Sequence, residues 1–548
     1  MSPGRRRLVP WLVLAGVLGV AAVSRAQFLS IPFERDEGIY AYFARLILEG
    51  ETPFLGFYEV KPPGLYYAYA GIAWIFGDTV EGIRTGFLLV NLATLVLVFA
   101  VGRRLRDEQT GLVAAASLMV LSLAPMASGF ASQAEHLVVL FALAGLLLML
   151  SGLDRGSLAR LFGAGLALGA SVLIKQNGAF FAAALGAGLG IALWPRRTGD
   201  ARRLGRAVGA FSAGVVLPLA GSVLVMWRQG ALGAFWFWTV EVSGAYVSEV
   251  GLTSGLRFLV GQLRRVAQHD EIFWVLGLAG LAAFWVGAGR VGASRRTAKI
   301  VLACFAAASF AATAPGLRFY SHYWLLVMPA LALGVGVAFS SAGAWLSSRT
   351  GREVWRLAAG GVFATLWLLH LAIRAPYYFQ PDFEAVLRQV YGFNPFLEAK
   401  VIGDHLREHT SAGDTIVVIG SEPEVYFYAG RRCPSRHAYF EYLVFGHPDH
   451  RLWQREFIED VERARPRFVT LFRNRVSLVR APSADRAIFD WARRFLSDHY
   501  QLVGAAVTTP DYRTEYLWGR DRLEDFRAPK NAAVAFVYEW DDGSSSGR

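Results

Sequence analysis

The chain alternates long apolar blocks with short charged connectors. Leu, Ala, Val and Gly gather in windows long enough to cross a bilayer, which requires about 20 apolar residues in a helix. These windows lie at about 8–24, 84–102, 111–129, 135–153, 159–174, 178–194, 207–227, 272–289, 299–315, 323–345 and 355–374. The pattern predicts an α-helical polytopic membrane protein with about eleven transmembrane helices.

The connectors between the windows alternate in charge. Every second connector, counted from the basic N-terminus, carries several Arg or Lys side chains. These are Arg103, Arg104 and Arg106, then Arg155 and Arg160, then Arg196, Arg197, Arg202, Arg203 and Arg206, then Arg290, Arg295, Arg296 and Lys299, then Arg349, Arg352 and Arg356. Because cytoplasmic loops are enriched in such residues, we expect a cytoplasmic N-terminus and, after an odd number of spans, an extracytoplasmic tail.

Two apolar segments affect this topology. The first window follows a basic start and ends in small residues, as a signal peptide does, but we interpret it as an uncleaved anchor because many spans follow. The segment 65–76 is short and rich in Tyr, and counting it as a span would invert everything after it. We expect it to be a helix lying in the membrane interface.

The pattern changes after residue 374, where the apolar blocks stop. Residues 1–374 are therefore expected to form the transmembrane domain, with a long outer-face loop at 25–83, and residues 375–548 a soluble α/β domain. The predicted elements of the second domain are helices near 396–409, from about 423, at 454–465 and near 484–498, and strands at 415–420, 467–472, 500–507 and 532–540. The turn "GSEPEV" lacks G-x-G-x-x-G and a phosphate-binding lysine, so it predicts an ordinary strand-to-helix turn.

Composition narrows the class further. The sequence is 54% hydrophobic and 18% charged, with a formal net charge of +12. Its arginines lie in the connectors, so the positive charge indicates membrane topology, and no nucleic-acid partner is expected. Cys304 lies in an apolar block and Cys433 in the tail, and we predict no disulfide between them.

The outer-face loop opens with two adjacent carboxylates. Asp36 and Glu37 precede a segment with helical periodicity in its apolar residues. One interpretation is that the two acids complement the dipole of a first helical turn. The other is an active site just outside the bilayer, which is favoured by Lys61 and several tyrosines in the same loop.

The same loop contains "YEVKPPGLYY". Two prolines and a glycine fix the backbone directly after Lys61, so its ammonium group is presented from a stiff turn. A turn at the membrane entry with a snorkelling lysine would produce the same pattern. The motif alone leaves both interpretations open.

Together these motifs resemble the GT-C type membrane glycosyltransferases, in particular bacterial relatives of the dolichyl-phosphate-mannose protein mannosyltransferases and of the lipid A aminoarabinose transferases. The similar segments are "DEGIYAYFARLILEG", "KPPG", "GRRL", "LIKQNG" at 173–178, "HYWLLVMPAL" at 322–331 and, in the tail, "AGDTIVVIGSEPEVYFYAGRR". The resemblance implies a GT-C fold in the plasma (inner) membrane, with catalysis by the loop 25–83. It also implies a polyprenyl-phosphate-linked sugar donor drawn from the membrane lipid and transfer with inversion on the outer face.

Family knowledge then assigns roles to individual positions. Asp36 matches the catalytic carboxylate, a general base, and Glu37 is expected mainly to orient the site. Lys61 and Lys175 match basic residues near the donor phosphate. His322 and Tyr323 are further candidates at that phosphate.

Three polar residues are candidates for binding a substrate or a divalent metal ion. Glu135 and His136 begin the fourth span, where relatives often have a second acidic residue and where a polar helix cap is the alternative. Glu59 precedes the turn, but "YEVKPP" places one residue between glutamate and lysine where aminoarabinose transferases have none. The resemblance therefore leaves metal dependence open.

A transporter or flippase of lipid-linked sugars is the alternative function, since many spans and a lipid-binding groove would serve it too. Ion-coupled transporters usually place ionisable residues near the bilayer centre, whereas here the candidates cluster at the outer ends of the spans. A membrane-anchored binding protein would leave Asp36 and Lys61 unexplained. The sequence does not identify the sugar, or whether the acceptor is a glycan, a lipid or a protein.

Overall fold

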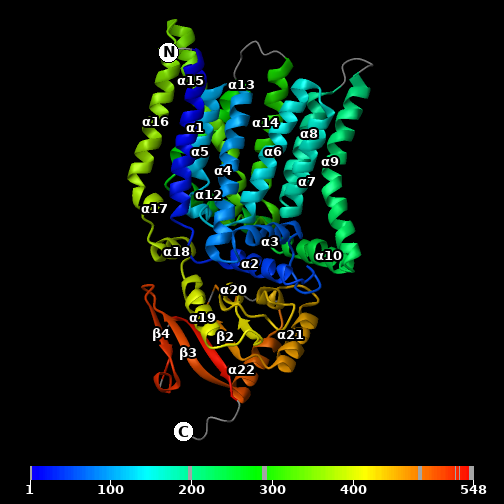
Figure 1. Ribbon diagram of the computed structural model, residues 1–548, viewed down its shortest axis with the longest axis vertical. Helices are drawn as coiled ribbons and strands as arrows, with labels where there is room; N and C mark the ends of the chain where they lie inside the picture. The colour runs from blue at the N-terminus through cyan, green and yellow to red at the C-terminus, as the bar shows by residue number, and fades with distance from the viewer. Residues whose placement is uncertain are drawn as a thin grey trace.

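A computed structural model describes residues 3–194, 200–286, 293–474, 476–478, 484–524, 526–529 and 531–541. It has a tall bundle of helices with a smaller domain of helices and a sheet at one end (Figure 1). The N-terminus lies at the end of the bundle away from this smaller domain (Figure 1). An odd number of crossings between the two ends gives this arrangement.

Each of the eleven predicted windows contains a helix. The helices are α1 (Pro3–Ala26), α4 (Val80–Leu105), α5 (Glu108–Leu121), α6 (Ala134–Arg155), α7 (Leu158–Ile174), α8 (Gly178–Ala192), α9 (Asp200–Arg228), α13 (Glu271–Val286), α14 (Ala293–Ala311), α15 (Met328–Thr350) and α16 (Val354–Ile373). In the described residues, six of them are long and apolar enough to cross a membrane, and α5, α7, α8 and most of α13 are shorter apolar helices. The polytopic helical fold is confirmed.

The predicted window 111–129 is too long at its outer end. Helix α5 stops at Leu121, and the chain continues as a short 3-10 turn at Pro125–Ala127 before α6 begins. Arg25 of α1 makes this possible, because its guanidinium donates hydrogen bonds to the carbonyls of Ser122 (2.9 Å) and Gly129 (3.0 Å). Carbonyl groups that leave a helix at membrane depth need such partners.

Two helices of the loop 25–83 lie across the end of the bundle that faces the smaller domain, between the two (Figure 1). These are α2 (Arg35–Leu48) and α3 (Gly64–Phe76). With 13 residues, α3 is too short to cross a bilayer, and it exposes Trp74 and Ile75. These features agree with the interfacial helix expected at 65–76.

The loop 228–271 contains helices that the sequence analysis did not predict. It forms α10 (Leu232–Trp236), a π-helical turn (Phe237–Val242), α11 (Ser243–Val247) and the longer α12 (Leu252–Ala267). Further along the chain, a 3-10 helix (Ser321–Leu326) precedes α15, so α15 begins five residues after the predicted start of its window.

The smaller domain follows α17 (Ala375–Phe379). Its helices are α18 (Phe383–Tyr391), α19 (Phe396–Glu408), α20 (Glu424–Ala429), α21 (His450–Ala464) and α22 (Ala487–His499), and its strands are β1 (Ile416–Ile419), β2 (Phe468–Arg473), β3 (Tyr500–Thr508), β4 (Thr514–Trp518) and β5 (Ala533–Trp540). The strand order is β1-β2-β5-β3-β4, with β1 and β2 parallel and the other pairs antiparallel. The elements predicted from the sequence are present, but α18 and β4 were missed.

Helix α2 packs directly on this domain. A Cβ atom at Gly38 would lie 2.3 Å from the Cβ of Glu424 in α20, so the contact requires glycine. The backbone N–H of Phe33, just before α2, donates a 2.6 Å hydrogen bond to the Tyr428 hydroxyl. The loop and the C-terminal domain are therefore joined closely.

The predicted orientation can be tested by cysteine labelling in intact cells. In a chain with Cys304→Ala and Cys433→Ala, we expect Arg513→Cys, on the exposed turn between β3 and β4, to react with a membrane-impermeant maleimide. Arg202→Cys, exposed at the other end of the bundle on α9, should react only after lysis. Reaction of Arg202→Cys in intact cells would contradict the topology.

Candidate active site

The first turn of α2 aims Asp36 into a cavity. Glu34 is the N-cap: its carboxylate accepts a 3.1 Å hydrogen bond from the backbone N–H of Glu37, and the Glu37 carboxylate accepts one of 3.2 Å from the N–H of Glu34. This reciprocal capping satisfies two donors that the start of a helix otherwise leaves unpaired. Asp36 is therefore not needed as a cap, and its side chain lines a cavity of about 880 Å³.

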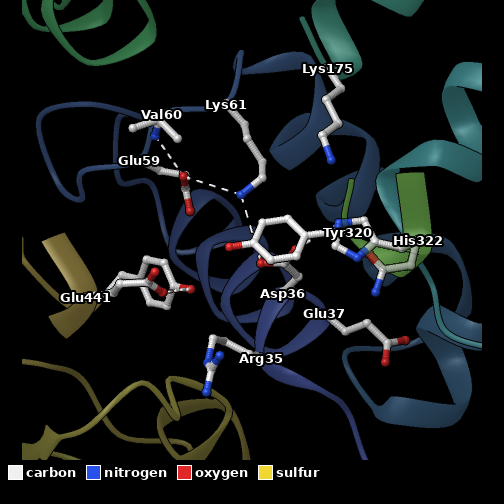
Figure 2. Close-up of polar contacts among 12 residues, drawn as sticks. Arg35, Asp36, Glu37, Glu59, Val60, Lys61, Lys175, Tyr320, His322 and Glu441 are labelled. Atoms are coloured by element: carbon white, nitrogen blue, oxygen red, sulfur yellow. Dashed lines mark hydrogen bonds and ion pairs between the residues drawn. The ribbon is translucent and has the colours of Figure 1, made fainter. Parts of the chain in front are cut away.

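Two basic side chains surround Asp36. Lys61 Nζ lies 4.0 Å from Asp36 Oδ1, and His322 Nε2 lies 3.9 Å from Oδ2 (Figure 2). Lys175 lines the same cavity and points toward this group from the side of Lys61 (Figure 2). The structure thus brings together Asp36, Lys61, Lys175 and His322, as the sequence analysis expected.

The charges of these groups follow from their surroundings. Burial raises the pKa of the Asp36 carboxyl, but the nearby positive charges, Lys61 foremost, outweigh burial and hold this pKa below its ordinary value. Burial lowers the pKa of Lys61, and the carboxylates of Glu59 and Asp36 more than reverse that effect. At neutral pH, Asp36 is a carboxylate and Lys61 an ammonium group.

His322 differs from the lysines. Burial is the largest influence on it and lowers the pKa of its imidazole. It is therefore neutral at pH 7 and acts as a hydrogen-bonding group rather than a cation.

The turn after Lys61 explains why two distant lysines meet. Pro62 and Pro63 stiffen the chain, and Gly64 begins α3 against the end of α7. A Cβ at Gly64 would lie 2.6 Å from the carbonyl oxygen of Leu173. Lys175 follows Leu173 by two residues, so this glycine contact sets the position of both lysines.

Lys175 is held by two partners. Its ammonium group lies 2.5 Å from Glu135 Oε1 and 4.3 Å from the centre of the Tyr323 ring. Glu135 is fully buried, and its second oxygen has no hydrogen-bond partner in the described chain. Among the sequence candidates, Glu135 and Tyr323 thus act on Lys175.

Glu37 lies on another side of the helix. Its side chain points away from Asp36 (Figure 2) and accepts hydrogen bonds from Arg84 of α4 (2.9 Å) and from the backbone N–H of Ser132 (2.5 Å). The adjacent carboxylates of Asp36 and Glu37 therefore contact different partners. The contacts of Glu37 connect α2 to the bundle.

Glu59 is buried beside Lys61, whereas His136 is buried but does not line the cavity. Glu59 accepts hydrogen bonds from the Val60 N–H (2.7 Å) and from the hydroxyl of Tyr442, and it lies 3.6 Å from Lys61 Nζ. His136 lies edge-on to Phe87, and its Nε2 has no partner within the described part of the chain. Over those same residues, no group of three His, Cys, Asp or Glu side chains is arranged to hold a metal ion.

The sequence analysis missed the contribution of the C-terminal domain. Tyr439 and Glu441 line the cavity, and the Tyr439 hydroxyl donates a 2.7 Å hydrogen bond to Glu441. Arg35 donates a 3.2 Å hydrogen bond to Asn394, which also lines the cavity. The contact of Arg35 with Asn394 joins positions 359 residues apart, and its local signal in the sequence was the basic residue beside the acidic pair.

The fold defined by this bundle, by α2 and α3 across its end and by the C-terminal domain is that of the GT-C type membrane glycosyltransferases. The crystal structure of ArnT from Cupriavidus metallidurans bound to undecaprenyl phosphate matches 96% of this chain and 97% of its own, with 16% identity and a TM-score of 0.55. Archaeal oligosaccharyltransferase AglB from Archaeoglobus fulgidus, in complex with an inhibitory peptide and a dolichol-phosphate, matches 95% of this chain and 75% of its own, with 13% identity and a TM-score of 0.51. At these identities the likeness shows the fold, and the expected GT-C fold is confirmed.

Sequence comparison points to the same class. Residues 60–227 match the family described as Dolichyl-phosphate-mannose-protein mannosyltransferase. The Undecaprenyl phosphate-alpha-4-amino-4-deoxy-L-arabinose arabinosyl transferase of Pseudomonas aeruginosa is 30% identical over 213 residues, which are 37% of this chain and 38% of that protein. The matched segment thus spans well under half of the relative, but the resemblance to these transferases is confirmed.

The buried pair of Glu37 and Arg84 should be important for stability. Arg84→Met leaves a buried carboxylate unpaired, which costs about 3 to 5 kcal/mol, and Arg84→Met combined with Glu37→Gln should recover part of the loss. The matched control is Arg104→Met on the same helix, whose pair with Asp154 is partly exposed and contributes about 1 kcal/mol or less. Thermal unfolding in detergent measures the loss of stability in each variant, which should be larger for Arg84→Met. Equal Tm values for Arg84→Met and Arg104→Met would contradict this prediction.

Proposed function

We propose that this protein is an inner-membrane glycosyltransferase that transfers a sugar from a polyprenyl-phosphate-linked donor to an acceptor hydroxyl on the outer face. The observation that carries the proposal is the position of Asp36. It is an ionised carboxylate in a cavity at the outer end of the bundle, within 4.0 Å of Lys61. A base next to an anion-binding group is the arrangement that such a transfer requires.

The donor phosphate fits between Lys61 and Lys175. Both ammonium groups lie in a partly buried cavity, where contacts between a cation and a phosphate are strong. Two partly exposed apolar residues, Phe180 of α8 and Val247 of α11, line the cavity as well and give the polyprenyl chain an apolar path to the bilayer. Tyr323 and Glu135 would hold Lys175 in place, and His322 would donate a hydrogen bond to the phosphate.

Asp36 would act as the general base. As the acceptor oxygen bonds to the anomeric carbon, the bond from that carbon to the phosphate oxygen breaks, and the acceptor proton moves to Asp36. The products are the glycosylated acceptor and the polyprenyl phosphate. Attack from the side opposite the phosphate inverts the anomeric carbon.

Donor binding would also strengthen the base. The positive charges around Asp36 hold its pKa low in the empty site. A phosphate anion between the lysines offsets part of that charge, so the pKa of Asp36 rises toward the value that burial alone favours. The carboxylate therefore becomes more basic when the donor is in place.

The remaining carboxylates support these groups. Glu37, tied to Arg84, would position the first turn of α2, and Glu59 would fix the ammonium group of Lys61. Glu59 and Glu135 each have one oxygen without a partner in the described chain, and they are the carboxylates available to a divalent metal ion. No step of the proposed reaction passes through a metal.

The position of the charged residues also separates this function from transport. Asp36, Lys61 and His322 lie on segments outside the spanning helices, and Lys175 lies directly after α7. A flippase or ion-coupled transporter would place such groups along a path through the bundle. The site instead suits chemistry at one membrane face.

Replacing the base should remove activity without unfolding the protein. Asp36→Asn keeps the size of the side chain and leaves the Glu34 cap intact, so we expect a rate about 10² to 10⁴ times lower with little change in Tm. Glu49→Gln, an exposed carboxylate at the other end of α2, serves as the control. The measurement is release of undecaprenyl phosphate from lipid-linked sugars extracted from source membranes, and near-normal turnover by Asp36→Asn would refute the assignment.

The pH profile gives an independent test of the site electrostatics. Lys61→Met removes the strongest opposing charge, so burial should raise the pKa of Asp36. Since the base works deprotonated, the acidic limb of kcat/KM should shift to higher pH, together with a lower affinity for undecaprenyl phosphate. Lys400→Met, on a surface ion pair of α19, is the control, and an unchanged acidic limb in Lys61→Met would show that Lys61 does not act on Asp36.

A further inference from the structure

The cavity continues beyond Asp36 into a wall built largely by the C-terminal domain. We define this outer wall by six lining residues, Gln262, Arg265, Gln389, Tyr391, Asn394 and Tyr512. It connects to the catalytic turn, because Arg35 donates a 3.2 Å hydrogen bond to Asn394. In the view of Figure 2, Arg35 and Lys175 point to opposite sides of Asp36.

The cavity has room for more than the donor headgroup. Its volume of about 880 Å³ is near the upper end of the roughly 300 to 1,000 Å³ found for ligand sites. With a phosphate and one sugar between the lysines and Asp36, the space at the outer wall remains for the acceptor.

The outer wall has the chemistry of a carbohydrate site. Five of its six residues carry an aromatic ring or a side-chain amide, which suit the apolar faces and paired hydroxyl groups of a sugar, and the sixth is Arg265. Gln389 and Tyr512 are both exposed, and neither side chain forms a hydrogen bond to another described residue. Both are free to contact a ligand.

The backbone at Tyr512 adds an independent observation. It follows Pro510 and Asp511 in the turn between β3 and β4, its N–H donates a 2.9 Å hydrogen bond to Thr509, and its φ is 67°. Glycine or asparagine suits this left-handed position at the end of a hairpin turn, whereas a bulky aromatic residue is strained there. The ring rests against Phe393, with centroids 4.7 Å apart, and this places a strained tyrosine at the cavity. Strained residues of this kind cluster at ligand sites.

The charges of the outer wall argue against an anionic acceptor. The nearby Arg388 is paired with the buried carboxylate of Glu398, and Arg265 donates to the carbonyl of Val390. Glu441 adds a carboxylate to the same cavity. Arg265 is the one cationic side chain among the six residues of the outer wall, whereas Lys61 and Lys175 both line the cavity near Asp36.

We propose that the outer wall binds a neutral carbohydrate chain, one hydroxyl of which is the acceptor. This inference rests on the proposed glycosyltransferase function. It makes the C-terminal domain the part of the protein that selects the acceptor, with Tyr512 as a stacking surface and Gln389 as a hydrogen-bonding group.

The test uses full-length protein in nanodiscs, applied to an array of neutral oligosaccharides, their phosphorylated counterparts and Ser/Thr-rich peptides. Wild type should be retained by neutral oligosaccharides, and Tyr512→Asn and Gln389→Ala should be retained about tenfold less. Asparagine suits the left-handed backbone position, so we expect Tyr512→Asn to stay folded, and its Tm is measured alongside binding to separate lost contact from unfolding. Tyr512→Phe should retain binding, and Arg513→Ala, an exposed neighbour outside the cavity, should behave as wild type.

Binding of undecaprenyl phosphate is measured in parallel and should be equal in all these variants. Retention only by phosphorylated sugars or by peptides, no retention by any neutral oligosaccharide, or equal retention of Tyr512→Asn and wild type would overturn the inference. If the wild type does not bind undecaprenyl phosphate, the proposed function itself fails.

Discussion

The first turn of α2 is the constraint on which the site depends. Four charged residues follow one another there, and successive helical positions point about 100° apart, so each finds a different partner. Glu34 caps the helix, Arg35 bonds the C-terminal domain, Asp36 lines the cavity and Glu37 pairs with Arg84 in the bundle. A single turn thus fixes the start of α2, the C-terminal domain and the bundle relative to the carboxylate that we assign as the base.

The two lysines depend on a second contact of the same kind. Their approach is set by backbone packing, since Gly64 touches the end of α7 just before Lys175. Charge alone would keep Lys61 and Lys175 apart. Their approach is tolerated because the carboxylates of Glu59 and Glu135 lie beside them. An anion-binding site is therefore held ready by packing that does not involve the anion.

Much of this could be predicted from the sequence. Eleven apolar windows appear as eleven helices, and Asp36 and Lys61, one from each loop motif, meet at one cavity, because hydrophobic periodicity and short motifs are local signals. The end of α5 was wrong because Arg25, a distant residue, satisfies the carbonyls after Leu121. Strand β4 was missed because it is a short edge strand that pairs only with β3. The cavity residues Glu441 and Tyr512 were missed because their place in the cavity depends on how the C-terminal domain docks, which leaves no local periodic pattern.

The close contact of α2 with α20 also constrains the order in which the protein can be completed during synthesis. Phe33 and its hydrogen-bond partner Tyr428 are 395 residues apart. At about 5 to 20 residues per second, the ribosome makes the second roughly 20 to 80 seconds after the first. Until then the carboxylate-bearing turn lies uncovered at the membrane surface. The site can therefore close only after nearly the whole chain has been made and its last domain has docked on α2, so incomplete chains carry an exposed but unfinished site.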